Sequence, residues 1–119
     1  MLSTEEAIKY LTNNIPALKD ELRSYVGLFT VQMGVFAKYT QLYIDTSDKV
    51  NAEFCFKVAS VILRDGNAEV KNAVAVSYCE GLNFNDGKKM RTWAKKLMPE
   101  NLLQTYNDVN DYLDKLFSK

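Results

Sequence analysis

Apolar residues recur every three or four positions along most of the 119-residue chain, and this period limits the fold more than any other feature. The last segment shows it best, because its apolar residues step by four, three, four and three: Leu102, Tyr106, Val109, Leu113 and Leu116. Polar residues follow similar steps on the opposite side: Gln104, Asp108, Asp111 and Lys115. The pattern is typical of a helix with one buried face and one solvent face.

Residues 48–65 have the same period and predict a second long helix. A polar stripe runs along it: Lys49, Glu53, Lys57, Ser60 and Arg64. Apolar residues occupy another face: Val50, Phe54, Val58 and Ile62. So narrow a polar stripe indicates a helix with most of its surface buried. Glu53 and Lys57 have the favourable order for an exposed ion pair across one turn.

Local signals divide the first third of the chain into shorter helices. Ser3 with Glu6 is a capping-box pattern, and Pro16 suits the first turn of a second helix. One face of that second helix is expected to carry Leu18, Leu22 and Tyr25. Residues 28–44 have a helical period, although Phe29, Val31 and Met33 also alternate as in a short strand. We expect a helix there, because the surrounding segments are helical.

Capping residues and breakers also divide the second half. Asn67 caps a segment of small and apolar residues that ends at Gly81, and we expect this helix to be central and the most buried. Asn85 or Asp86 is expected to cap a sixth helix, which ends before Pro99. The sequence therefore predicts an all-α fold, a single domain of residues 1–119 with about seven short helices packed as antiparallel hairpins.

The chain contains no histidine, which removes the usual zinc ligand and the catalytic arrangements that pair serine or cysteine with an imidazole. No phosphate-binding glycine loop and no calcium-loop pattern occurs. Two pairs of carboxylates, Asp108 with Asp111 and Glu5 with Glu6, are close on one helical face, but they lie on predicted solvent faces, where carboxylates do little chemistry. We therefore expect no enzyme, no cofactor, no metal site and no small-molecule substrate.

Charge and cysteine content restrict the class of partner and the compartment. Fifteen basic residues balance fifteen acidic ones, whereas nonspecific nucleic-acid binding usually needs a positive excess. Cys55 and Cys79 lie among apolar neighbours, as buried thiols in a reducing compartment do. The acidic start and the absence of a long apolar stretch predict a cytoplasmic protein without a membrane span.

A basic cluster surrounds Trp93: Lys88, Lys89, Arg91, Lys95 and Lys96. Basic residues beside an aromatic side chain can bind nucleic acid or an acidic partner. The alternative is that these cations lie on the solvent-exposed face of a helix, whose buried face carries Met90, Trp93, Ala94 and Leu97. We favour this second interpretation, because the steps of three, one and three between those four residues are the ones that a buried helical face requires.

The last helix carries the opposite charge. Three acidic residues follow one another on it, Asp108, Asp111 and Asp114, and its one cation is Lys115. Such a face can simply favour solubility, or it can imitate phosphate charge and block a basic cleft. Tyr112 lies off the apolar stripe, so we expect it to be exposed, and tyrosine is common at binding hot spots. These four residues form the predicted partner-binding face.

The run from Asn67 to Val76 (NAEVKNAVAV) resembles the second helix of a HEAT-type repeat. This resemblance implies a HEAT-like, right-handed array of helical hairpins. The whole chain also resembles small all-helical bacterial proteins, among them immunity proteins of polymorphic and contact-dependent toxin systems. That resemblance rests on size, two capped central helices and the final amphipathic helix, and it transfers no residue-level motif. It implies tight binding to a toxin domain, often a nuclease, with occlusion of its active site.

We therefore expect a protein–protein binding module, in first place an immunity protein that neutralises a cognate toxin. The alternative is a HEAT-like scaffold or adaptor without an inhibitory role. A second alternative is a nucleic-acid-binding module that uses the basic segment 88–96, and its affinity would fall steeply with salt.

Overall fold

The computed structural model describes residues 1–85 and 91–117, most of which are helical. The first half of the chain forms α1 (Thr4–Asn14), the 3-10 turn η1 (Pro16–Leu18), α2 (Lys19–Arg23) and α3 (Phe29–Asp45). The second half forms α4 (Lys49–Asp65), α5 (Ala68–Ala73), the π-helical segment η2 (Val74–Cys79), α6 (Thr92–Lys96) and α7 (Glu100–Phe117). Across these described ranges there are seven α-helices and no strand, so the predicted all-α fold is confirmed.

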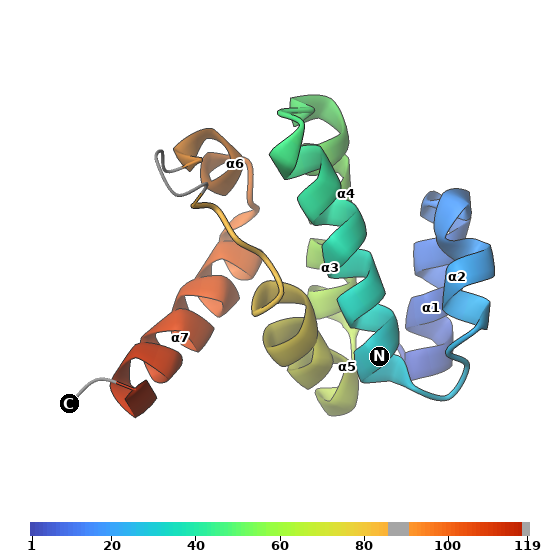
Figure 1. Cartoon of the computed structure of the whole chain (residues 1–119). Helices are drawn as coiled ribbons and strands as arrows, with labels where there is room; N and C mark the ends of the chain where they lie inside the picture. The colour runs from blue at the N-terminus through green and yellow to red at the C-terminus, as the bar shows by residue number, and fades with distance from the viewer. Residues whose placement is uncertain (86–90, 118–119) are drawn as a thin grey trace.

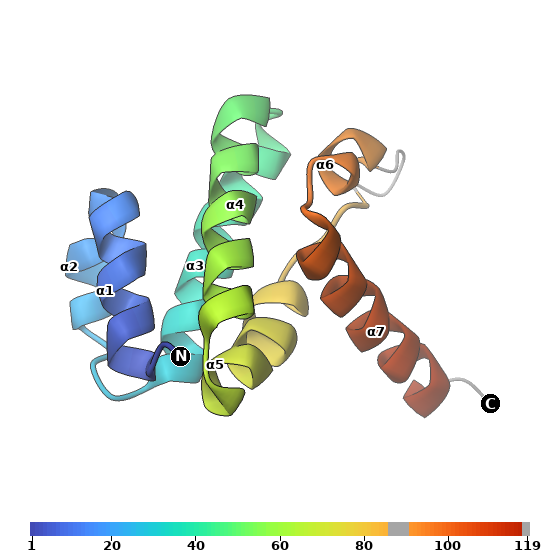
Figure 2. The same ribbon diagram turned by 180° about the vertical axis from the view of Figure 1, so that it is seen from behind.

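The α1–α2 hairpin lies at one end of the molecule and α7 at the other (Figure 1). The long helices α3 and α4 pair between them and are joined by the short turn 46–48. The helix formed by α5 and η2 packs against α3, α4 and α7, which can be followed from behind in Figure 2. Antiparallel hairpins are therefore present, whereas a HEAT-like order of those hairpins stays a prediction.

The helix starts follow the local signals in the sequence. Ser3 and Glu6 form the complete capping box, and hydrogen bonding to Ser3 lowers the pKa of the Glu6 carboxyl. Pro16 is the first residue of η1, and the Asn67 side chain accepts a hydrogen bond from the backbone N–H of Val70. Residues 29–45 form a helix, so the short strand that their alternation also allowed does not occur.

Some side chains predicted to be inside lie outside. Tyr25 is 37% exposed, because α2 ends at Arg23 and Tyr25 falls in the turn that follows. Val50 and Phe54 of α4 are 79% and 44% exposed. Val58 and Ile62 of the same predicted face are buried, together with Ala52, Cys55 and Phe56, which that face did not include. The period and the inner half of the predicted face are confirmed, and the burial of Val50 and Phe54 is wrong.

The sixth helix is shorter than predicted. It begins at Thr92, after Arg91 as its N-cap, so Asn85 does not cap it. The alternative cap, Asp86, lies outside the described residues, as does Met90 of the predicted buried face. Ala94 is fully buried and Trp93 and Leu97 are half-buried, which confirms that face for the part of the helix that is described. Pro99 separates this helix from α7 as expected.

The α5–η2 helix is central, and Tyr78 anchors it. Tyr78 is fully buried, its ring centroid lies 4.6 Å from that of Phe36, and its hydroxyl is 2.9 Å from the Thr40 hydroxyl. Burial raises the pKa of Tyr78 well above its ordinary value, so the phenol stays neutral in the core. The outer side of the helix is less covered than predicted, since Val76 of η2 is 43% exposed.

The two cysteines are buried and free, as predicted for structural thiols. Burial raises the pKa of Cys55 to about 11 and that of Cys79 to about 12, which keeps both thiols protonated at neutral pH. In the described part of the chain, no helix is long and apolar enough to cross a membrane.

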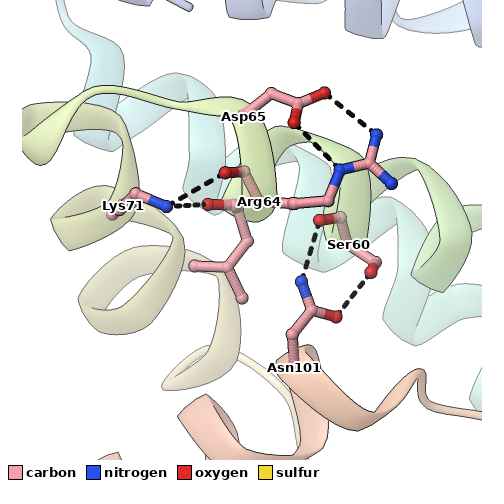
Figure 3. A network of polar contacts seen from close by, with 6 residues as sticks. Ser60, Arg64, Asp65, Lys71 and Asn101 are labelled. Atoms are coloured by element: carbon pink, nitrogen blue, oxygen red, sulfur yellow. Dashed lines mark hydrogen bonds and ion pairs between the residues drawn. The ribbon is translucent and has the colours of Figure 1, made fainter. Parts of the chain in front are cut away.

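Polar contacts join α7 and α5 to α4 (Figure 3). Ser60 donates to the Asn101 side-chain oxygen at 2.5 Å, and the Asn101 amide donates back to the Ser60 carbonyl at 3.0 Å. Lys71 of α5 donates to the carbonyls of Leu63 and Arg64 at 2.8 and 3.1 Å. The Lys71 ammonium thereby satisfies acceptors at the carboxyl end of α4, where helix carbonyls lack partners.

Replacing Val74 with aspartate should lower the free energy of unfolding by roughly 3–5 kcal/mol, because an unpaired carboxylate would enter the core. Val76→Asp is the matched control, since it adds the same charge two residues further along the same helix. Val74 is 1% exposed and Val76 43%, so the control should cost less than ~1 kcal/mol. Urea unfolding followed by circular dichroism measures both, and similar midpoints would contradict this packing.

Replacing Asn101 with alanine should cost about 1–2 kcal/mol, because the variant loses the paired hydrogen bonds to Ser60 and leaves partly buried groups unsatisfied. Asn110→Ala is the control on the same helix, because the Asn110 side chain is half-buried and makes no hydrogen bond within the described chain. Urea denaturation should separate the two variants clearly. Equal loss of stability in both would show that the Asn101 contacts do not hold α7 to α4.

Candidate protein-binding site

An apolar groove with acidic edges lies between η2 and the second half of α7. Its volume is about 370 Å³, and its walls include Val76, Glu80, Asp108, Val109, Tyr112 and Leu113. Three of these side chains, Val109, Tyr112 and Leu113, follow one another at helical spacing on α7. We call this hollow the C-terminal groove.

The first half of α7 fixes the orientation of this groove. Leu102 is fully buried, and Tyr106 is nearly so, with its ring centroid 5.1 Å from that of Phe84. Further along, Tyr112 is 65% and Leu116 58% exposed. The helix is therefore held by its amino-terminal half, while its carboxyl-terminal half leaves one apolar side accessible beside η2.

The structure brings together two of the four residues predicted for the partner-binding face. Asp108 and Tyr112 both line the C-terminal groove. Asp111 and Asp114 are exposed, but they lie ~60° and ~120° further around the helix from Asp108. They form a solvent-facing acidic stripe that starts at the edge of the groove and leads away from it.

The sequence does not identify two groove residues, Val76 of η2 and Glu80, the C-cap that follows η2. Val76 belongs to a run that is apolar on almost every side, and that composition predicts burial. The spacing of the apolar residues in α7 indicates the groove wall that this helix forms. Nothing in the sequence indicates that η2 and α7 diverge enough to leave a hollow between them. Contact between segments so far apart in the chain is a property of the tertiary structure.

The charged residues of the groove wall are acidic, and Lys115 of α7 lies beside the acidic stripe. Glu80 and Asp108 are the charged residues in the groove wall, and no cation of the described chain lies within ion-pair distance of either. The same holds for Asp111 and Asp114. Asp108 accepts one hydrogen bond, from Gln104 at 2.9 Å. A partner with lysine or arginine would therefore meet carboxylates that are not engaged in an ion pair within the described chain.

The basic cluster is engaged differently. Lys88 and Lys89 lie outside the described residues. Arg91 forms an ion pair with Asp45, whose pKa is lowered by a hydrogen bond from Gln41 and also by Arg91. The Lys95 ammonium lies 5.4 Å from the centroid of the Tyr106 ring, a cation–π contact. Two cations of the predicted cluster thus make contacts within the molecule, while Lys96 is exposed.

The described residues contain no group of three or more cysteine, aspartate or glutamate side chains arranged to hold a metal ion. The C-terminal groove offers apolar contact and carboxylate charge, and it has no buried polar side chain to orient a small ligand. Its chemistry suits a polypeptide with apolar side chains next to lysine or arginine.

Comparison with known proteins gives one match, to a protein family. No curated protein and no solved structure matches the chain significantly. The sequence model of one family matches residues 8–114, a range that includes the α7 and η2 walls of the groove. The description of this family assigns no activity to its members. The chain belongs to this family, described as a domain of unknown function, DUF7674.

Proposed function

We propose that this protein is a protein–protein binding module, and that the C-terminal groove with the acidic stripe of α7 is its recognition surface. The observation that carries the proposal is that, in the described chain, no cation forms an ion pair with Glu80, Asp108, Asp111 or Asp114. Exposed apolar surface beside these carboxylates supports it, because Val76 and Tyr112 offer contact area for an anchoring side chain.

The specific form of this proposal is an immunity protein that binds a cognate toxin domain in the cytoplasm. An acidic helix can enter a basic, nucleic-acid-binding cleft, because its carboxylates take the place of phosphates. Opposite charge also speeds association, which matters for an inhibitor that has to reach its toxin before the toxin acts. The size of the chain, its helical fold and the missing imidazole fit an inhibitor better than an enzyme.

A scaffold or adaptor function is the second candidate. The C-terminal groove favours it independently of charge, since an apolar hollow between two helices can accept one side of an amphipathic helix. An adaptor would bind with modest affinity and would not protect a cell from a toxin. A test of whether the protein protects cells from its partner therefore distinguishes the two proposals.

Asp108→Lys combined with Asp111→Lys should abolish toxin neutralisation while leaving the fold intact, because both side chains are exposed. The tagged protein is used to capture its partner from the native host, and the partner's toxin domain is then expressed in a sensitive strain. Co-expression of the wild type should restore growth. The double variant should lose at least about 100-fold in affinity, consistent with several charge contacts reversed at one interface.

Asp20→Lys combined with Glu21→Lys is the matched control. It makes the same change of net charge on α2, at the opposite end of the molecule from α7 (Figure 1). This control should protect as well as the wild type. Full protection by the α7 variant would show that the acidic stripe is not the interface. A captured partner that is harmless when expressed would contradict the immunity function and favour the adaptor.

A further inference from the structure

A second, larger groove lies on the other side of the α5–η2 helix. Its volume is about 650 Å³, and its wall includes Glu5 of α1, Val26 and Leu28 of the α2–α3 turn, and Glu69 and Asn72 of α5. We call it the N-terminal groove. Neither the sequence patterns nor the proposed function assigns it a role.

Exposed apolar side chains mark this groove as an unpartnered surface. Val26 is 74% and Leu28 55% exposed, on either side of Gly27. Gly27 has a φ of +85°, a conformation that residues with a Cβ rarely adopt, and the turn is closed by a 2.9 Å hydrogen bond from the Leu28 N–H to the Tyr25 carbonyl. The backbone thus holds both apolar side chains outward at a fixed place beside the groove.

The charge of the N-terminal groove matches that of the C-terminal groove. Glu5 and Glu69 are its charged wall residues, and the ion pairs of the described chain include neither. Together the two groove walls carry four carboxylates, Glu5, Glu69, Glu80 and Asp108, and no lysine or arginine. In a protein of net charge zero, this separation of charge gives both grooves the same preference for a basic partner.

One helix forms a wall of both grooves. Asn72 and Ala73 line the N-terminal groove, and Ala75 and Val76 line the C-terminal groove. The two grooves therefore flank the same helix. A partner large enough to cross this helix reaches both.

Backbone donors add to the N-terminal groove. Leu28 is the N-cap of α3 and has no side chain that can accept a hydrogen bond from the first turn. Phe29 and Thr30, the first residues of α3, line this groove. A backbone carbonyl of an incoming polypeptide can accept from this helix start, whereas the flanking carboxylates select against an acidic segment.

We infer that the recognition surface extends across α5–η2, and that the N-terminal groove binds a second segment of the same partner, one with large apolar side chains beside lysine or arginine. This inference rests on the proposed function, because it takes the partner to be a protein that also occupies the C-terminal groove. It adds the chemistry of the segment and the place where it docks.

The test maps binding of a defined probe to the whole protein. An 18-residue amphipathic peptide of leucine and lysine, which spans ~27 Å as a helix, is titrated into the isotope-labelled chain and followed by amide NMR. Amides of Val26, Leu28 and Asn72 should shift in the same titration as those of Val76 and Tyr112. A leucine–glutamate peptide of equal length should cause no such shifts.

Glu5→Gln with Glu69→Gln should weaken binding of the leucine–lysine peptide to the N-terminal groove by about 10-fold at low salt, roughly 3-fold for each exposed carboxylate. Glu21→Gln on α2 is the control, because Glu21 is exposed and lines neither groove. Shifts confined to α7 and η2 would overturn this inference and leave the proposed function standing. Shifts in neither groove would overturn both, and equal affinity of the double variant and the control would overturn the inference alone.

Discussion

Tyr78 contributes the contact on which the rest of the structure depends. Its ring packs on Phe36, and its hydroxyl finds a partner in Thr40, so the largest buried side chain of η2 enters the core without an unsatisfied polar group. The Thr40 hydroxyl donates to the Phe36 carbonyl at 3.0 Å, so its oxygen accepts from the Tyr78 hydroxyl. This arrangement fixes the α5–η2 helix against α3, and α7 then packs against η2.

The orientation of η2 decides which of its residues remain outside. Val74, Tyr78 and Cys79 point into the core, and Val76 and Glu80 therefore face the space beside α7. The contacts of Asn101, Leu102 and Tyr106 secure only the first half of α7. A hollow between η2 and the second half of α7 is the consequence, and the accessible acidic and apolar side chains of both helices become its walls.

Several basic side chains make their contacts away from the two grooves. Arg91 pairs with Asp45, Arg64 with Asp65, and Lys57 with Glu53, while Lys71 binds backbone carbonyls of α4. These contacts lie on other parts of the molecule. The carboxylates of the two grooves form no ion pair in the described chain, although the protein as a whole is neutral. These carboxylates can therefore pair with the cations of a partner, which is the physical basis of both proposals.

Much of the local structure could be predicted from the sequence. The capping box at Ser3, the Asn67 cap, the helical turn at Pro16 and the ion pair of Glu53 with Lys57 depend on neighbours within one turn, so their signals lie in adjacent residues. The exposure of Tyr112 and Asp108 followed from the period of α7 in the same way. The candidate site was predicted in part, since one wall of the C-terminal groove belongs to that helix.

Only the tertiary structure decided which distant segments of the chain are in contact. Val50 and Phe54 have the apolar character of a core face, yet they lie outside, whereas Val58 and Ile62 of the same predicted face are buried. Val76 and Glu80 become groove residues only because α7, some thirty positions later, diverges from η2. The sequence by itself determined the helices and their caps, which depend on local hydrogen bonds and spacing. The choice of faces and the hollows between them depend on how side-chain volumes fit across the core.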